Sequence, residues 1–240
     1  MGMHRTDVDL RPLAALVADR HARAGGRGIL VGLSGGVGVG KSTTAAAVSG
    51  HLAELHGLPT TVVSSDGFLF TTAQLDARGL TARKGFPESY DRDAIDTFIG
   101  AVRAGVDPLS VPMYDHLFYD VLPDRTEVPN APIVIFEGVN VLHFADQLDL
   151  GIYIDAAEPD MRRWFVKRVL QLRDEAAGVE GAFLAPFAGL DDTAMAALAE
   201  SVWESINLPN LHEAIEPMRD RADVVVVKGP DHAITEILIR

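Results

Sequence analysis

The sequence predicts an α/β fold of three layers, with a mostly parallel sheet between two layers of helices. Short apolar runs alternate along the chain with segments of helical length and pattern. Several runs are continuously apolar, which is typical of parallel strands that are covered on both faces. The predicted strands are residues 29–33, 60–64, 133–136, 151–154 and 223–227. The predicted helices are residues 42–56, 92–104, 159–173 and 192–206.

The length of 240 residues suits one large domain, and no Gly/Ser linker or repeat divides it. Residues 1–27 are rich in charge and predict one amphipathic N-terminal helix. Residues 28–240 then form a single domain. Two Pro-bearing stretches, residues 67–91 and 108–130, look irregular and are long for plain connections. We therefore expect them to be substrate-binding loops.

Composition excludes several classes of function. The formal net charge of −13 argues against a general nucleic-acid binder and against attachment to anionic lipid. No apolar run approaches the roughly 18–20 residues that cross a bilayer, and no secretion signal is visible. The absence of cysteine removes disulfides and thiolate metal sites. We expect a cytoplasmic protein that binds neither nucleic acid nor membrane.

The strongest motif lies between the first predicted strand and the first predicted helix. Residues 35–42 read GGVGVGKS and fit the phosphate-loop pattern G-x-x-x-x-G-K-[ST]. Such a turn points backbone N–H groups at phosphate, and the following helix N-terminus favours negative charge. The motif predicts a P-loop NTPase sandwich that uses ATP. The predicted nucleotide-binding residues are Gly35, Gly36, Val37, Gly38, Val39, Gly40, Lys41, Ser42 and Thr43.

Two acids follow predicted strands and are expected beside this loop. Asp66 comes after the strand at 60–64, and Glu137 comes directly after the strand at 133–136, as in a Walker B element. Asp66 could accept the proton of an attacking hydroxyl or help to hold the metal. Ser42 and Glu137 are the candidate Mg²⁺ ligands, in part through water, and Glu137 could instead position the nucleophile. A basic helix offers Arg168 or Arg173 to the transferring phosphoryl group, and helical spacing alone does not choose between them.

Several longer blocks resemble bacterial type I pantothenate kinases, whose wider relatives are uridine kinase and phosphoribulokinase. The similarity runs from about residue 28 to 240. The most specific block is residues 84–91, KGFPESYD. Other blocks are SSDGFL at 64–69, Y-x-H-x-x-YD at 114–120, EG-x-NVL at 137–142, INL-x-NL at 206–211 and DHA at 231–233.

The resemblance implies an ATP-dependent phosphotransferase with an alcohol acceptor, which makes 4′-phosphopantothenate in coenzyme A biosynthesis. It implies that Lys41, Asp66, Glu137 and Arg168 are catalytic and that the protein forms a homodimer. Lys228 and His232 would lie by the adenine. The acceptor pocket would be lined by Asp66, Tyr114, His116, Tyr119, Phe165, Arg168, Phe183, Phe187 and Asn207.

Departures from the family leave alternatives open. Phe165 stands where the family has tyrosine, and Phe183 and Phe187 lie in a pocket that is tyrosine-rich elsewhere. Ala46 replaces an arginine that in the family contacts the phosphates of coenzyme A. Whether coenzyme A inhibits this protein is therefore an open question. The N-terminal region is shorter than in typical members. The alternatives are a kinase for a nucleoside or sugar-like alcohol, and a catalytically silent ATP-binding regulator.

Overall fold

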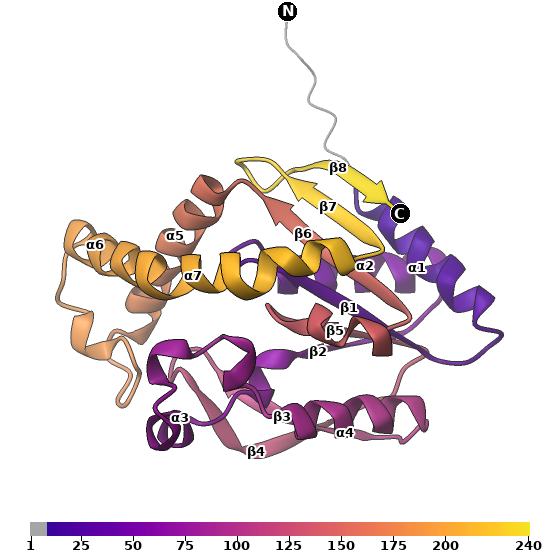
Figure 1. Ribbon diagram of the computed structural model, residues 1–240, viewed down its shortest axis with the longest axis horizontal. Helices are drawn as coiled ribbons and strands as arrows, with labels where there is room; N and C mark the ends of the chain where they lie inside the picture. The colour runs from indigo at the N-terminus through magenta and orange to yellow at the C-terminus, as the bar shows by residue number, and fades with distance from the viewer. Residues whose placement is uncertain (1–8) are drawn as a thin grey trace, which may run out of the picture.

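A six-stranded sheet forms the centre of the protein, as the computed structural model of residues 9–240 shows (Figure 1). Its strand order is β2-β5-β1-β6-β7-β8, and every neighbouring pair is parallel except β7 with β8. All five predicted strands are confirmed. The strands are β1 (Ile29–Gly35), β2 (Thr60–Ser64), β5 (Ile133–Glu137), β6 (Leu150–Ala156), β7 (Val224–Lys228) and β8 (Ile234–Ile239).

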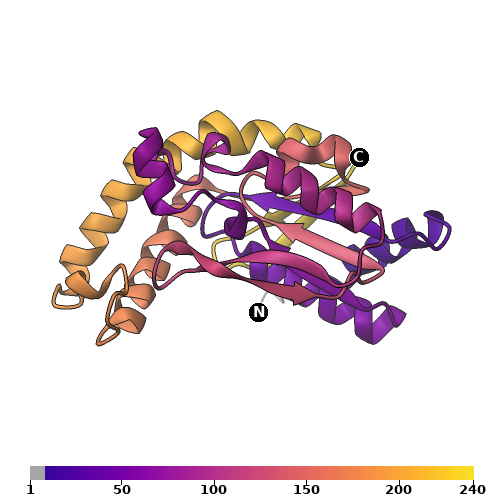
Figure 2. The ribbon, with the colours of Figure 1, turned by 90° about the horizontal axis from the view of Figure 1, so that it is seen from below.

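Helices cover both faces of this sheet, which confirms the three-layer prediction (Figure 2). One layer holds α1 (Arg11–Arg23) and α2 (Lys41–His56), and the other holds α4 (Arg92–Arg103). The remaining helices are α3 (Thr72–Arg78), α5 (Glu158–Ala176), α6 (Asp192–Val202) and α7 (Leu208–Asn210). Within residues 9–240, no helix is long and apolar enough to cross a membrane.

The core fixes the carboxyl ends of the central strands, where the predicted site lies. Every residue of β1 and β5 is buried. Phe68, Phe98 and Phe136 form an aromatic cluster with ring centroids 5.2–5.7 Å apart. This cluster packs α4 and the short 3₁₀ turn Ser65–Phe68 against β5. The turn that carries Asp66 is therefore held in place because the Phe68 ring at its end is buried in this cluster.

Two expectations about the chain's organisation need correction. Residues 108–130 are not irregular, because they form an antiparallel hairpin of β3 (Leu109–Asp115) and β4 (Asp120–Val128). The helix predicted at 192–206 continues through π-helical turns at Trp203–Asn207 and Leu211–Ile215, which flank α7. Of the predicted N-terminal helix, α1 is present, and residues 1–8 lie outside the described residues.

Candidate active site

The predicted phosphate loop is a tight turn between β1 and α2. Gly35, Gly38 and Gly40 have φ angles of 150°, 78° and 84°, which residues with a Cβ rarely adopt. A Cβ on Gly35 would lie 2.4 Å from the carbonyl oxygen of Ile154, and one on Gly38 would lie 3.1 Å from the backbone nitrogen of Phe165. Only glycine lets the loop pass this close to β6 and α5. The same turn carries Gly36, Val37 and Val39, and Ser42 and Thr43 open α2.

Lys41 folds back over this loop. Its ammonium donates to the carbonyl oxygens of Gly35 at 3.2 Å and Gly36 at 2.9 Å. Burial lowers the pKa of Lys41, while the charges of Glu137 and Asp66 act in the opposite direction. The cation thus lies at the phosphate loop, within electrostatic reach of two carboxylates. The negative charge of a bound triphosphate would compensate for the solvation that the buried ammonium has lost.

Sheet register brings the two acids together. Ser64 at the end of β2 pairs with Glu137 at the end of β5, and Leu33 of β1 pairs with Glu137 from the other side. Asp66 lies two residues beyond Ser64, in the 3₁₀ turn, and its backbone N–H donates to Ser64 Oγ at 3.3 Å. Both carboxylates therefore lie at the carboxyl edge of the sheet, where doubly wound folds bind ligands.

Glu137 and Ser42 form a pair suited to Mg²⁺. Ser42 Oγ donates to Glu137 Oε1 at 2.8 Å, and Glu137 is only 5% exposed. Burial raises the pKa of Glu137, while Lys41 and the Ser42 hydrogen bond act in the opposite direction. A hydroxyl and a carboxylate are hard oxygen donors, and Mg²⁺ bound with substrate phosphates needs only one or two protein ligands. These residues fit such an ion.

Lys228 and His232 lie beside the phosphate loop. Lys228 Nζ donates to the Val39 carbonyl at 2.9 Å and to Thr44 Oγ1 at 3.0 Å. Burial and the charge of Lys41 lower the pKa of Lys228 to about 8. The His232 ring stacks on Trp164 at 3.7 Å between centroids. Lys228 therefore braces the loop from behind, and a role at the adenine remains a prediction.

The predicted acceptor residues lie around a cavity between Asp66 and the β3–β4 hairpin. A cavity of about 240 Å³ is lined by Asp66, Tyr114 and His116 among others. Ring centroids of Tyr114 lie 5.1 Å from His116 and 6.2 Å from Tyr119. Phe183 stacks on Tyr119 at 4.7 Å. Five of the predicted pocket residues therefore gather at one place although they come from separate segments.

The remaining predicted residues are less closely grouped. Arg168 is exposed on α5, and its ion pair is with Glu175 at 3.4 Å. Asn207 has a buried side-chain Nδ2 without a hydrogen-bond partner in residues 9–240, and its role at the acceptor remains a prediction. Phe165 on α5 and Phe187 in a short 3₁₀ turn are both partly buried.

Curated relatives identify the family. The chain is 40% identical over 226 residues to a pantothenate kinase of Rhizobium johnstonii, a match that covers 88% of this chain and 68% of the relative. It is 41% identical over 227 residues to a pantothenate kinase of Sorangium cellulosum, covering 90% and 74%. The chain belongs to the pantothenate kinase family. No family model matches the sequence.

Solved structures agree with this fold. A proposed fructose transport system kinase of Silicibacter sp. TM1040 superposes with a TM-score of 0.70 at 28% identity, covering 90% of this chain and 95% of that one. D-glycerate 3-kinase of Cryptococcus neoformans superposes with a TM-score of 0.69 at 15% identity, covering 96% and 99%. The second likeness shows the shared kinase fold alone.

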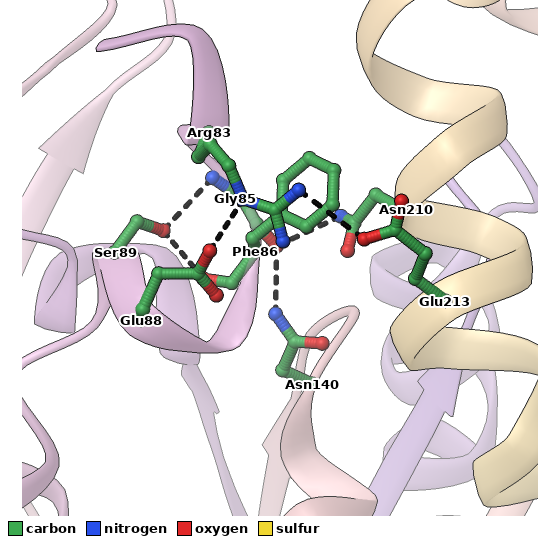
Figure 3. Close-up of polar contacts among 8 residues, drawn as sticks. All are labelled: Arg83, Gly85, Phe86, Glu88, Ser89, Asn140, Asn210 and Glu213. Carbon is green, nitrogen blue, oxygen red and sulfur yellow. Dashed lines mark hydrogen bonds and ion pairs between the residues drawn. The ribbon is translucent and has the colours of Figure 1, made fainter. Parts of the chain in front are cut away.

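Three residues near the site of this pantothenate kinase family member were not singled out from the sequence. Lys84 extends over the rings of Tyr114 and Tyr119. Asn140 and Asn210 both bind the backbone at Gly85 (Figure 3). All three belong to the blocks that resemble pantothenate kinases, so block membership was the available signal. Their roles depend on contacts between distant segments, which the blocks do not reveal.

Proposed function

We propose that this chain transfers the γ-phosphoryl group of ATP to the primary hydroxyl of pantothenate, which begins coenzyme A biosynthesis. Membership of the pantothenate kinase family supports the substrate. The observation that carries the chemistry is the position of Asp66. Its carboxylate interacts electrostatically with Lys41 at the phosphate loop and also lines the acceptor cavity. A hydroxyl in that cavity would face the outermost phosphate.

In the proposed reaction, Asp66 orients the acceptor hydroxyl and accepts its proton as the phosphoryl group transfers. Lys41 and the backbone N–H groups of residues 35–42 hold the phosphates and stabilise the charge that spreads over them. Ser42 and Glu137 would hold Mg²⁺, which supplies further charge neutralisation. Because phosphoryl transfer depends mainly on positioning and electrostatics, the rigid edge of the sheet is a suitable platform.

A direct assay tests this proposal. The purified protein is given ATP, Mg²⁺ and pantothenate, and ADP release is coupled to mass detection of the phosphorylated product. We expect product from the wild type, and a loss of at least about a hundredfold in kcat for Asp66→Asn and for Lys41→Met. Pantothenate-independent ADP release, with no phosphorylated pantothenate, would contradict the proposal.

A sugar-like or nucleoside alcohol is the second candidate acceptor. It is favoured by the apolar ring of Phe183, which stacks on Tyr119 beside the cavity, and by the likeness to the Silicibacter kinase at 28% identity. A panel of sugars, nucleosides and pantothenate in the same assay separates the candidates. ATP binding without product from any acceptor would instead indicate a catalytically silent regulator.

Three further features belong to the proposal. We propose that Mg²⁺ is required, that the protein acts in the cytoplasm where ATP is made, and that it forms a homodimer as the family resemblance suggests. EDTA should abolish turnover, and sedimentation should give twice the chain mass. Coenzyme A should inhibit weakly, because Ala46 offers no cation to its phosphates.

A further inference from the structure

A second, smaller cavity lies beside the turn that carries Asp66. Its volume is about 30 Å³, and none of its lining residues belongs to the acceptor cavity. Its wall is formed by the turn Ser65–Phe68, residues 87–90, α4, β5 and the 3₁₀ helix Val141–Gln147. Much of this wall is apolar, with Ile95, Phe136 and Val141 almost fully buried. The cavity therefore lies where several segments that support the proposed active site meet.

Two polar atoms on this wall are buried and unpaired. Ser65 is 2% exposed and Asn140 is 5% exposed, and both residues line the cavity. Within residues 9–240, neither Ser65 Oγ nor Asn140 Oδ1 has a hydrogen-bond partner. A buried polar atom without a partner has lost its hydration without replacement, so native proteins pair almost all such atoms with protein or with ordered water. Two such atoms on one wall indicate a ligand that pairs with both.

The amide of Asn140 defines what this ligand must offer. Asn140 Nδ2 donates to the Gly85 carbonyl oxygen at 2.6 Å (Figure 3). This bond fixes the orientation of the amide and leaves Oδ1 free, and an amide oxygen can only accept. The Ser65 hydroxyl can both donate and accept. The ligand must therefore donate to Asn140 and can either donate to Ser65 or accept from it.

Tyr90 contributes a third polar group. It lines the cavity and is 7% exposed. Burial and the charge of Asp66 raise the pKa of Tyr90 well above its ordinary value, and the nearby Ser65 acts in the opposite direction. The Tyr90 hydroxyl is therefore neutral and keeps its proton. It lies near Ser65, yet the two hydroxyls do not have the geometry of a hydrogen bond with each other.

The lining residues argue against a charged ligand. They include Arg92 and His143 but no carboxylate. A cation would therefore meet a guanidinium and no opposite charge, which is unfavourable for a buried ion. An anion would face the Asn140 oxygen, which offers no proton. The chemistry of the wall thus fits a small neutral molecule that both donates and accepts.

The size of the cavity completes the choice. A single buried water needs roughly 10–15 Å³ of such space and typically makes about three hydrogen bonds. A cavity of about 30 Å³ therefore has room for water and not for an organic ligand. We propose that this cavity is a binding site for an ordered water molecule, which donates to Asn140 Oδ1 and forms a hydrogen bond with Ser65 Oγ.

This water connects two parts of the proposed active site. Ser65 directly precedes Asp66, and Asn140 holds the Gly85 carbonyl in the segment of residues 84–91. The water therefore ties the turn of the proposed base to that segment. It takes no part in phosphoryl transfer, so its presence does not depend on which acceptor the protein uses.

A crystal structure of the full chain, at a resolution that shows ordered waters, tests the site. We expect a solvent peak about 2.6–3.2 Å from both Ser65 Oγ and Asn140 Oδ1. A peak that reaches only one of the two atoms, or none, would overturn the proposal. A Ser65 hydroxyl that bonds directly to Tyr90 in place of water would overturn it as well.

Thermal melting of a double-mutant cycle tests the same link in solution. Ser65→Ala and Asn140→Leu each remove one partner of the water and should each lower Tm by about 2–8 °C. In the double variant, the loss should be about 2–4 °C smaller than the sum of the single losses, because either substitution alone already breaks the bridge. Ser201→Ala, which removes an exposed hydroxyl on α6, is the matched control and should combine additively with Asn140→Leu. Additive losses for Ser65→Ala and Asn140→Leu would contradict a shared water.

Discussion

Replacing Gly67 by alanine should separate the acceptor site from the nucleotide site. Gly67 is buried in the turn that carries Asp66, directly against β3. A Cβ here would lie 2.4 Å from the carbonyl oxygen of Pro112 and 2.8 Å from its carbonyl carbon. Ordinary contacts begin at 3.4 Å, so the two backbone segments must move apart by roughly 1 Å.

That displacement should have two measurable consequences. Overpacking costs about 1–3 kcal/mol, which lowers Tm by about 2–12 °C in a domain of this size. A shift near 1 Å between Asp66 and Tyr114 should lower kcat/KM for the acceptor by about a hundredfold. The Kd for ATP should change less than about threefold, because the phosphate loop does not contact Gly67.

Coupled ADP release, calorimetric ATP titration and thermal melting measure these quantities. The matched control is Gly100→Ala on α4, where a Cβ meets nothing within 4 Å. Because alanine favours a helix over glycine, that control should be as stable as the wild type or more so, and fully active. If Gly67→Ala keeps the wild-type Tm and acceptor kinetics, or loses ATP affinity in parallel, the described packing of the hairpin is wrong.

The remaining predictions concern three polar contacts. Lys228 has a pKa of about 8 when folded and 10.5 as its ordinary value, so the unfolded chain binds more protons between these limits. Wild-type stability should therefore rise relative to Lys228→Met by up to about 3 kcal/mol from pH 8 to 10.5, measured by urea unfolding; a constant difference would contradict this. Asn210→Leu removes one of the two side-chain donors to the Gly85 carbonyl and should raise KM for pantothenate about three- to tenfold, whereas an unchanged KM would exclude a role for this contact at the acceptor site. Glu137→Gln should raise the Mg²⁺ concentration for half-maximal rate about tenfold or more, and an unchanged Mg²⁺ titration would remove Glu137 from the metal site.

Local pattern was enough to predict the sheet and the phosphate end of the site. Apolar runs marked β1, β2, β5, β6 and β7, since buried parallel strands leave a strong signal. Asp66 and Glu137 could be placed because an acid after such a strand must lie at the carboxyl edge of the sheet. The loop glycines could be placed because their motif is contiguous. In each case, neighbours in sequence determine the geometry.

The acceptor end depended on contacts that sequence neighbours do not determine. In the β3–β4 hairpin one strand is mostly polar, and each strand contains a proline, Pro112 or Pro123. Because proline argues against a strand, the sequence pattern favoured a loop. The Gly85 carbonyl meets Asn140 and Asn210 only after three distant segments pack together. The hydrogen bond from Lys228 to the Val39 carbonyl likewise joins residues that are 189 positions apart. Tertiary packing, not local propensity, decides each of these contacts.

A single-turnover experiment tests the central claim most directly. The enzyme in excess over γ-³²P-labelled ATP is mixed with pantothenate and Mg²⁺, and the label is followed into the product. We predict that the label passes to pantothenate in the wild type and stays on ATP in Asp66→Asn, although both proteins bind ATP equally. Equal transfer by both proteins, or label released only as inorganic phosphate, would contradict the account.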